Sequence, residues 1–235
     1  MRWTNLAAWV AGSLMFLLAG CDAEKDAVIA QYKAGEAAIA AKNAVEYRST
    51  LSTKSIQHFQ EILRLAREGP AKEVRDLPAA HMEHVLALRN RVKPDKLRAM
   101  TVDEYIAWMI DQEFLLVDEE IGLKPFGVTI SGDRAMMQYG VDSARKERST
   151  TFGRRRLITS AFSGGTKLEA IPGAYVYFDK INGHWYNDDT TLNEDYERSM
   201  KDEATEAKKP LPDYMAQLEK EAHGTLIPSI WSPPK

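Results

Sequence analysis

The chain has 235 residues, a single cysteine and a formal net charge of −3 at pH 7. This length is enough for one or two domains, and one domain with extensions is the simpler arrangement. The mild negative charge gives no general attraction to nucleic acid, so nucleic acid is not an expected partner. A single cysteine excludes an intramolecular disulfide, and stability must therefore come from an apolar core.

The chain starts with a short basic stretch and then an uncharged run. Arg2 is followed by the sequence LAAWVAGSLMFLLAG, from Leu6 to Gly20. This run is shorter than the roughly 18 to 20 apolar residues that span a bilayer as a permanent helix. A basic start before an apolar segment is typical of a secretory signal peptide, and we expect residues 1–20 to be one. The alternative is a membrane-tethered helix with an incidental cysteine.

The end of this run, Leu18-Ala19-Gly20-Cys21, resembles the lipobox of bacterial lipoproteins. The resemblance implies cleavage before Cys21, a diacylglycerol on the Cys21 sulfur and an acyl chain, such as palmitate, on the new amino group. Attachment by two or more acyl chains is stable because each buried methylene contributes about 0.8 kcal/mol. The resemblance also implies a lipid anchor at Cys21 on the periplasmic side of a bacterial membrane. Asp22 resembles the enterobacterial signal for the inner membrane, and the outer membrane is the alternative.

After the signal peptide we expect an anchored α+β domain at residues 21–192, helical from 25 to 120. Apolar residues at helical spacing favour helices in this part. Asn43 is an expected break, Ser52 or Thr53 an expected helix cap, and Gly69-Pro70 an expected stop. The sequence TVDE at Thr101–Glu104 has the capping-box pattern and predicts another helix start.

From about residue 125 to 190 the pattern changes from helical to alternating. The sequence FGVTISGDRAMMQYGV predicts two strands around Gly132-Asp133, and RRRLITSAF predicts another strand. The pair Asn182-Gly183 is favoured in a type I′ turn, so the strands around it should form a hairpin in an antiparallel sheet. Residues 193–235 are expected to be a charged helical extension with a Pro-rich tail. In that tail Ile227, Ile230 and Trp231 are expected to dock on the domain or contact a partner.

Three segments resemble the nuclear transport factor 2-like superfamily over residues 25–190. These are KAGEAAIAAKNAVEYRSTLSTKSIQHF, SGDRAMMQYGV and VYFDKINGHWYNDD. The resemblance implies N-terminal helices packed on a curved antiparallel sheet, here with a longer helical insert at about 70–120. It also implies a hollow that binds small hydrophobic molecules in some members. In isomerase and cyclase members the hollow holds a carboxylate base or a His–Asp pair with a tyrosine donor.

Several side chains of the predicted hairpin are candidates for such a site. They are Tyr175, Tyr177, Asp179 and His184. Asp179 and His184 flank the turn, so we expect them to be strand-end residues exposed to water and not catalytic groups. Trp185 is expected in the core and not as a ligand platform.

His81 and His84 stand three residues apart on a predicted helix and could share a metal ion, but no third ligand accompanies them at a recognisable spacing. A solvated or capped histidine pair is therefore expected, and no metal or cofactor. A basic region could contact anionic lipid, although its charges also suit an edge strand kept soluble. It consists of Arg145, Lys146, Arg148 and Arg154 to Arg156.

Nucleophile motifs and phosphate loops are absent from the sequence. The predicted function is therefore a lipid-anchored envelope protein whose domain binds an envelope protein or a small apolar ligand. The alternatives are an isomerase- or hydrolase-like enzyme with a cone-shaped cavity, and a stalked envelope factor that docks through its C-terminal helix and tail. The resemblance to the lipobox implies one site residue, Cys21, as the lipidation site.

Overall fold

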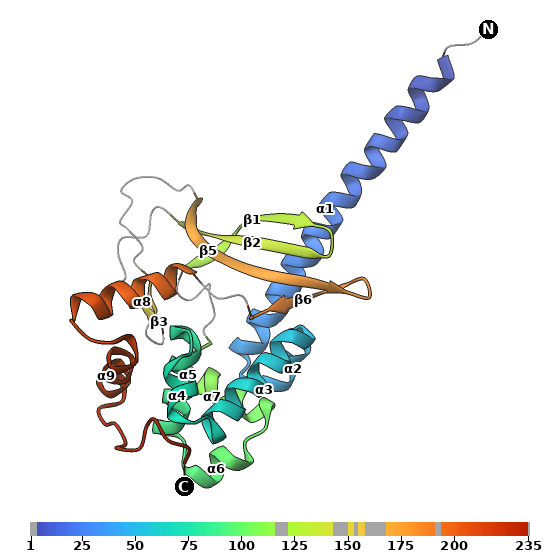
Figure 1. Ribbon diagram of the computed structural model, residues 1–235. Helices are drawn as coiled ribbons and strands as arrows, with labels where there is room; N and C mark the ends of the chain where they lie inside the picture. The colour runs from blue at the N-terminus through green and yellow to red at the C-terminus, as the bar shows by residue number, and fades with distance from the viewer. Residues whose placement is uncertain are drawn as a thin grey trace.

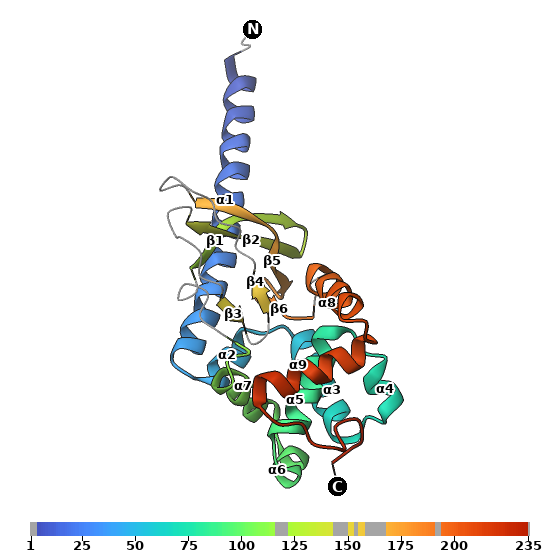
Figure 2. The same ribbon diagram turned by 90° about the vertical axis from the view of Figure 1, so that its left-hand side faces the viewer.

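The protein has an α+β fold in a computed structural model that describes residues 4–115, 122–142, 150–152, 155–157, 168–190 and 194–234. Helices make up the first half and the C-terminal end, and strands lie between them (Figure 1). In both views the N-terminal part of α1 projects beyond the rest of the chain, and the C-terminus lies at the opposite end (Figures 1 and 2).

The N-terminal half consists of helices whose starts and ends follow local signals. The helices are α1 (Thr4–Ala40), α2 (Ala44–Thr50), α3 (Thr53–Glu68), α4 (Ala71–Arg75), α5 (Ala79–Arg91), α6 (Pro94–Ala99) and α7 (Val102–Asp111). Asn43 caps α2, and the Ser52 side chain accepts a hydrogen bond from a backbone N–H in the first turn of α3. Thr101 and Glu104 form the predicted capping box of α7. The helix starts and stops predicted at these positions are confirmed.

The described strands form a four-stranded antiparallel sheet in the order β1-β2-β5-β6 and a separate pair, β3-β4. The strands are β1 (Leu123–Ser131), β2 (Arg134–Asp142), β3 (Thr150–Phe152), β4 (Arg155–Leu157), β5 (Leu168–Ile181) and β6 (His184–Asp188). Both predicted hairpins are confirmed, and Asn182 and Gly183 both have positive φ, as a type I′ turn requires. Of the strand predicted in RRRLITSAF, β4 lies within the described residues, and residues 158–162 lie outside them.

One face of the sheet packs on α1. Val28 and Tyr32 of α1 share a buried cluster with Met137, Phe178 and Trp185 of the sheet. Tyr175 and Tyr177 point to the other face because side chains alternate along a strand, and they stay partly accessible. The two faces of this hairpin therefore differ in burial.

The other helices pack around a second cluster that includes the C-terminal extension. The extension consists of α8 (Glu194–Glu206), α9 (Leu211–His223) and an irregular tail. Met200, Met215 and Ile230 are buried together with residues of α3 and α5. The Glu197 carboxylate of α8 accepts backbone hydrogen bonds from the first turn of α5, at 2.9 and 3.0 Å. Ile227 and Trp231 pack against the same cluster, so the expected docking of the tail on the domain is confirmed.

Within the described part of the chain, no helix has both the length and the apolar character needed to cross a bilayer.

Candidate functional site

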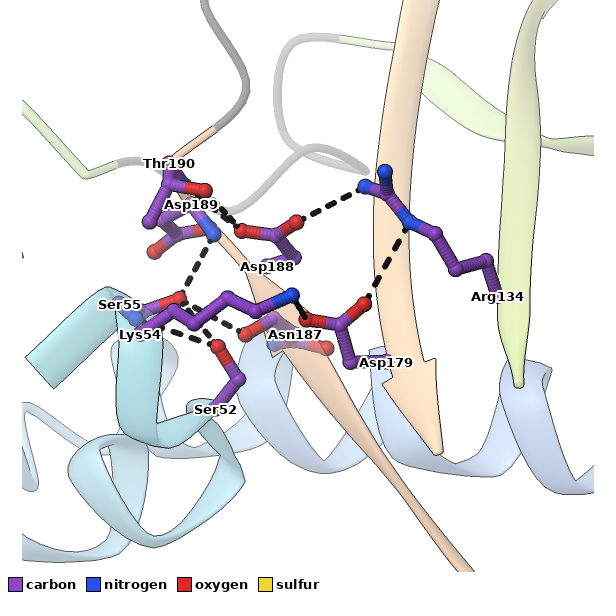
Figure 3. A network of polar contacts seen from close by, with 9 residues as sticks. All are labelled: Ser52, Lys54, Ser55, Arg134, Asp179, Asn187, Asp188, Asp189 and Thr190. Carbon is purple, nitrogen blue, oxygen red and sulfur yellow. Dashed lines mark hydrogen bonds and ion pairs between the residues drawn. The ribbon is translucent and has the colours of Figure 1, made fainter. Parts of the chain in front are cut away.

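A network of polar side chains connects the sheet with the start of α3 (Figure 3). Asp179 on β5 and Asp188 on β6 are buried, with 6% and 5% of their surfaces exposed. Lys54 approaches from the first turn of α3 and Arg134 from the first residue of β2 (Figure 3). Arg134 and Asp179 face each other because the β2–β5 register pairs them directly.

Each oxygen of the two buried carboxylates faces a donor or cation of the same chain. Asp179 Oδ2 lies 2.9 Å from Lys54 Nζ, and Asp179 Oδ1 lies 3.4 Å from Arg134 Nε. Asp188 Oδ2 accepts a hydrogen bond from Arg134 Nη2 at 3.0 Å. Asp188 Oδ1 accepts bonds from the Thr190 backbone N–H at 3.0 Å and from the Thr190 hydroxyl. The oxygens of both carboxylates are therefore paired with donors and cations of the same chain, which suits a structural connection and not a general base.

Hydrogen bonds and a β-bridge join the end of β6 to the start of α3. The carbonyl oxygen of Asn187 accepts bonds from Ser52 N at 2.8 Å and from Ser55 Oγ at 3.0 Å. Ser55 Oγ in turn accepts from Asp189 N at 2.9 Å. Leu51 and Asn187 form a parallel β-bridge, so the residues that cap α3 also bind the last residues of the sheet. The orientation of α3 relative to the sheet is fixed at its first turn.

The Asn187 side chain lies close to Gly35 of α1. A Cβ atom at position 35 would lie 2.9 Å from Asn187 Nδ2. Among the described buried side chains, Asn187 Oδ1 is the oxygen without a hydrogen-bond partner, while Asn187 Nδ2 donates to Thr50 Oγ1 at 3.4 Å. A buried carbonyl oxygen of this kind is an expected site for an ordered water molecule.

Two histidines lie beside the network, at the interface of α3 and α5. The ring centroids of His58 and His81 are 4.4 Å apart. Burial lowers the pKa of His58 to about 4, the neighbouring His81 adds to this effect, and the carboxylates of Asp188 and Glu61 oppose it. Burial also lowers the pKa of His81, against the opposing field of Glu197. Both imidazoles are therefore neutral at pH 7.

The structure separates the two histidines that the sequence paired. His81 stacks against His58, whereas the His84 ring packs on Phe114 at 4.9 Å between centroids, and His84 Nδ1 shares a hydrogen bond of 2.7 Å with the Tyr105 hydroxyl. Among the described residues, no three His, Cys, Asp or Glu side chains are placed to hold a metal ion together.

Of the hairpin candidates, Asp179 lies in a different environment from the one expected. We expected it to be exposed to water, but it is buried and paired with two cations, because Lys54 and Arg134 cover this end of the sheet. His184 is exposed at the turn, as expected, and Trp185 is buried in the core, as expected. Tyr177 lies on the face that carries Asp179, with its ring centroid 5.9 Å from the Arg134 guanidinium.

Sequence analysis missed Lys54, His58, Arg134 and Asp188 as members of this region. The β2–β5 register pairs Arg134 with Asp179, but aligning the two predicted hairpins at their turns would place Arg134 opposite Ile181, so the hairpin patterns alone do not predict this pair. Lys54 and His58 carried no signal either, since their contacts depend on how α3 meets the sheet. Of the basic region, Arg145, Lys146, Arg148 and Arg154 lie outside the described residues. Arg155 and Arg156 belong to β4.

No family model, no curated protein and no solved structure matches the chain.

Proposed function

We propose that the protein is a lipid-anchored protein of a bacterial envelope, attached through Cys21, whose periplasmic domain binds another envelope protein or a small apolar ligand and does no catalysis. Asp22 favours the inner membrane in this proposal. The order of helices followed by a curved antiparallel sheet supports a domain of the nuclear transport factor 2-like type.

The observation that carries the proposal is the course of α1. This helix runs without interruption from the uncharged segment Leu6–Gly20 into the folded body, where Val28 is fully buried against the sheet and Ala38 lies in the helical core. From Cys21 to Ala40 such a helix is about 28 Å long at 1.5 Å per residue. A lipid on Cys21 would therefore hold the domain on a rigid helix and not on a flexible linker. This arrangement suits a protein that presents a binding surface at a fixed height above the membrane.

The paired carboxylates argue against the enzymatic alternative. A general base of the isomerase type needs a carboxylate that is free to accept a proton from a substrate. The carboxylate oxygens of Asp179 and Asp188 instead form ion pairs and hydrogen bonds with Lys54, Arg134 and Thr190. The neutral His58 and His81 rings face each other between helices. The described part of the chain thus offers more support for binding than for proton transfer.

The anchor is tested by metabolic labelling with a palmitate analogue and by mass spectrometry of the native protein. We expect label on the wild-type chain, none on Cys21→Ser, and a mature protein that begins at a modified Cys21. An unmodified Cys21 with Met1 still present would contradict the proposal.

The binding role is tested by purifying the acylated protein from its own membranes and analysing proteins, lipids and small molecules together. A matched control joins residues 1–22 to an unrelated soluble domain, so that both proteins carry the same anchor. We expect a protein or an apolar molecule that is enriched with the full chain and absent from the control. Equal profiles for the two proteins would refute the binding role and leave the anchor untouched.

A further inference from the structure

The turn of the β5–β6 hairpin is held against α1 close to the anchoring cysteine. Glu24, three residues after Cys21, accepts a hydrogen bond from Trp185 Nε1 at 2.9 Å and another from Lys180 Nζ. Lys180 and Trp185 are the residues that flank the turn Ile181–His184. The turn is therefore attached on both sides to the same point of α1.

The β1–β2 turn lies beside it, and the two turns form one end of the domain. The Lys180 backbone N–H donates to the Asp133 carbonyl at 2.8 Å, which joins the hairpins at their tips. Residues 131–133 and 181–184 are exposed. In both views α6 and the C-terminus lie at the end of the molecule away from the N-terminal part of α1 (Figures 1 and 2).

The length of helix between Cys21 and Glu24 sets the height of this end. Three residues of α-helix rise about 4.5 Å. The polar layer on each side of a bilayer is about 5–8 Å thick, which is the difference between the total thickness and the hydrocarbon core. If the acyl chains of Cys21 enter the hydrocarbon core, Glu24 and the turn attached to it lie at the depth of the headgroups.

The chemistry of the turn agrees with contact to a lipid surface. Ile181 has 36% of its surface exposed at the tip, where its side chain can reach the boundary of the acyl chains. The charge of Lys180 is neutralised by Glu24, and exposed Asp133 adds a negative charge at the neighbouring tip. Among the described residues, this end of the domain has no excess of cations, so we derive its position from the helix and not from attraction to anionic lipid.

We propose that, in the anchored protein, the turn Ile181–His184 lies in the lipid headgroup layer, so that the sheet end of the domain faces the membrane and the helical end with the C-terminus faces away. This inference rests on the proposed anchor at Cys21. It assigns the membrane surface as the partner of the hairpin tips and leaves the helical end as the surface open to other proteins.

The test uses the full chain, acylated in cells, purified and returned to phosphatidylcholine–phosphatidylglycerol vesicles. Because the only native cysteine is occupied by lipid in this proposal, His184→Cys introduces the sole free thiol, to which a fluorophore is attached. A matched control places the thiol on the exposed face of α6, as Lys96→Cys. Quenching is then measured with lipids that carry a nitroxide on the headgroup.

We expect several-fold stronger quenching at position 184 than at position 96. Ser131→Cys on the neighbouring tip should behave as position 184 does, and it replaces His184→Cys if that variant does not fold. Equal quenching at both ends, or stronger quenching on α6, in protein that floats with the vesicles overturns the orientation and leaves the anchor intact. Protein that fails to float, or a wild-type chain whose Cys21 reacts with the thiol label, overturns the proposed anchor and with it this inference.

Discussion

Acidification should weaken the interface of α3 and α5 through His58. Its imidazole lies against His81, with ring centroids 4.4 Å apart, and burial lowers the pKa of His58 to about 4. Titratable groups face it from several elements: Glu61 of α3, Asp188 of β6 and His81 of α5. The two carboxylates do not compensate for the loss of hydration, so the native state resists protonation at this position.

The magnitude follows from the difference between the folded and unfolded pKa. A histidine in the unfolded chain has a pKa of about 6.5. Between about pH 6.5 and pH 4 the unfolded state therefore binds a proton at this position that the native state does not bind. Stability from this group is complete above pH 6.5 and is lost as the pH falls. At about 1.36 kcal/mol per pKa unit, the loss between about pH 7.5 and pH 5 is about 2 kcal/mol. His81, whose pKa is also lowered, changes stability in the same direction.

The assay is urea unfolding of the full-length protein in a non-ionic detergent, followed by circular dichroism at about pH 7.5 and pH 5. We compare the wild type with His58→Gln, which removes the titrating ring. Between about pH 7.5 and pH 5, the free energy of unfolding should fall by about 2 kcal/mol less in His58→Gln than in the wild type. His184→Gln, which changes an exposed histidine of the hairpin turn, is the matched control and should follow the wild type.

Equal losses of unfolding free energy in the wild type and in His58→Gln between the two pH values would contradict this prediction. That result would mean that His58 takes up its proton in the native state as readily as in the unfolded chain. The lower absolute stability expected for His58→Gln at neutral pH does not affect this comparison, because only the pH-dependent difference is used.

Three further substitutions test a buried guanidinium, a buried ion pair and a helix cap. Arg89→Met removes a buried guanidinium that donates to the carbonyls of Leu65 and Ala66, both at 2.9 Å. It should lower the free energy of unfolding by about 3 kcal/mol in the same urea assay. A loss below about 1 kcal/mol would contradict this role. Asp188→Ala leaves Arg134 without its closest carboxylate and should cost about 2–3 kcal/mol, measured by thermal melting, with an unchanged melting temperature as the opposing result. Thr101→Ala removes the α7 capping box and should cost about 1 kcal/mol, whereas Thr101→Ser should restore most of it.

The elements of this fold were predictable where a few neighbouring residues decide them. Caps at Asn43, Ser52 and Thr101 work within one helical turn, and the Asn182-Gly183 turn needs only two residues with positive φ. Alternation along β5 explains which of its side chains face the core.

Most contacts of the polar network could not be predicted from the sequence because the residues that make them are far apart in the chain. Lys54 and Asp179 are separated by 125 residues, and their contact depends on how the first turn of α3 meets the sheet. That geometry follows from the packing of two layers and from the close approach of Asn187 to Gly35. The prediction of an exposed Asp179 was wrong because position next to a turn gives no information about what another element places over it.

By itself, the sequence determined several helix ends, the two hairpin turns and the α+β class, because these depend on local hydrogen bonding and on the period of apolar residues. Only the tertiary structure decided the partners of the buried charges, the contact of His58 with His81 and the hydrogen bond from Arg89 to the Ile230 carbonyl of the tail. These features require side chains from distant segments to be brought together out of water, which only the packed layers achieve.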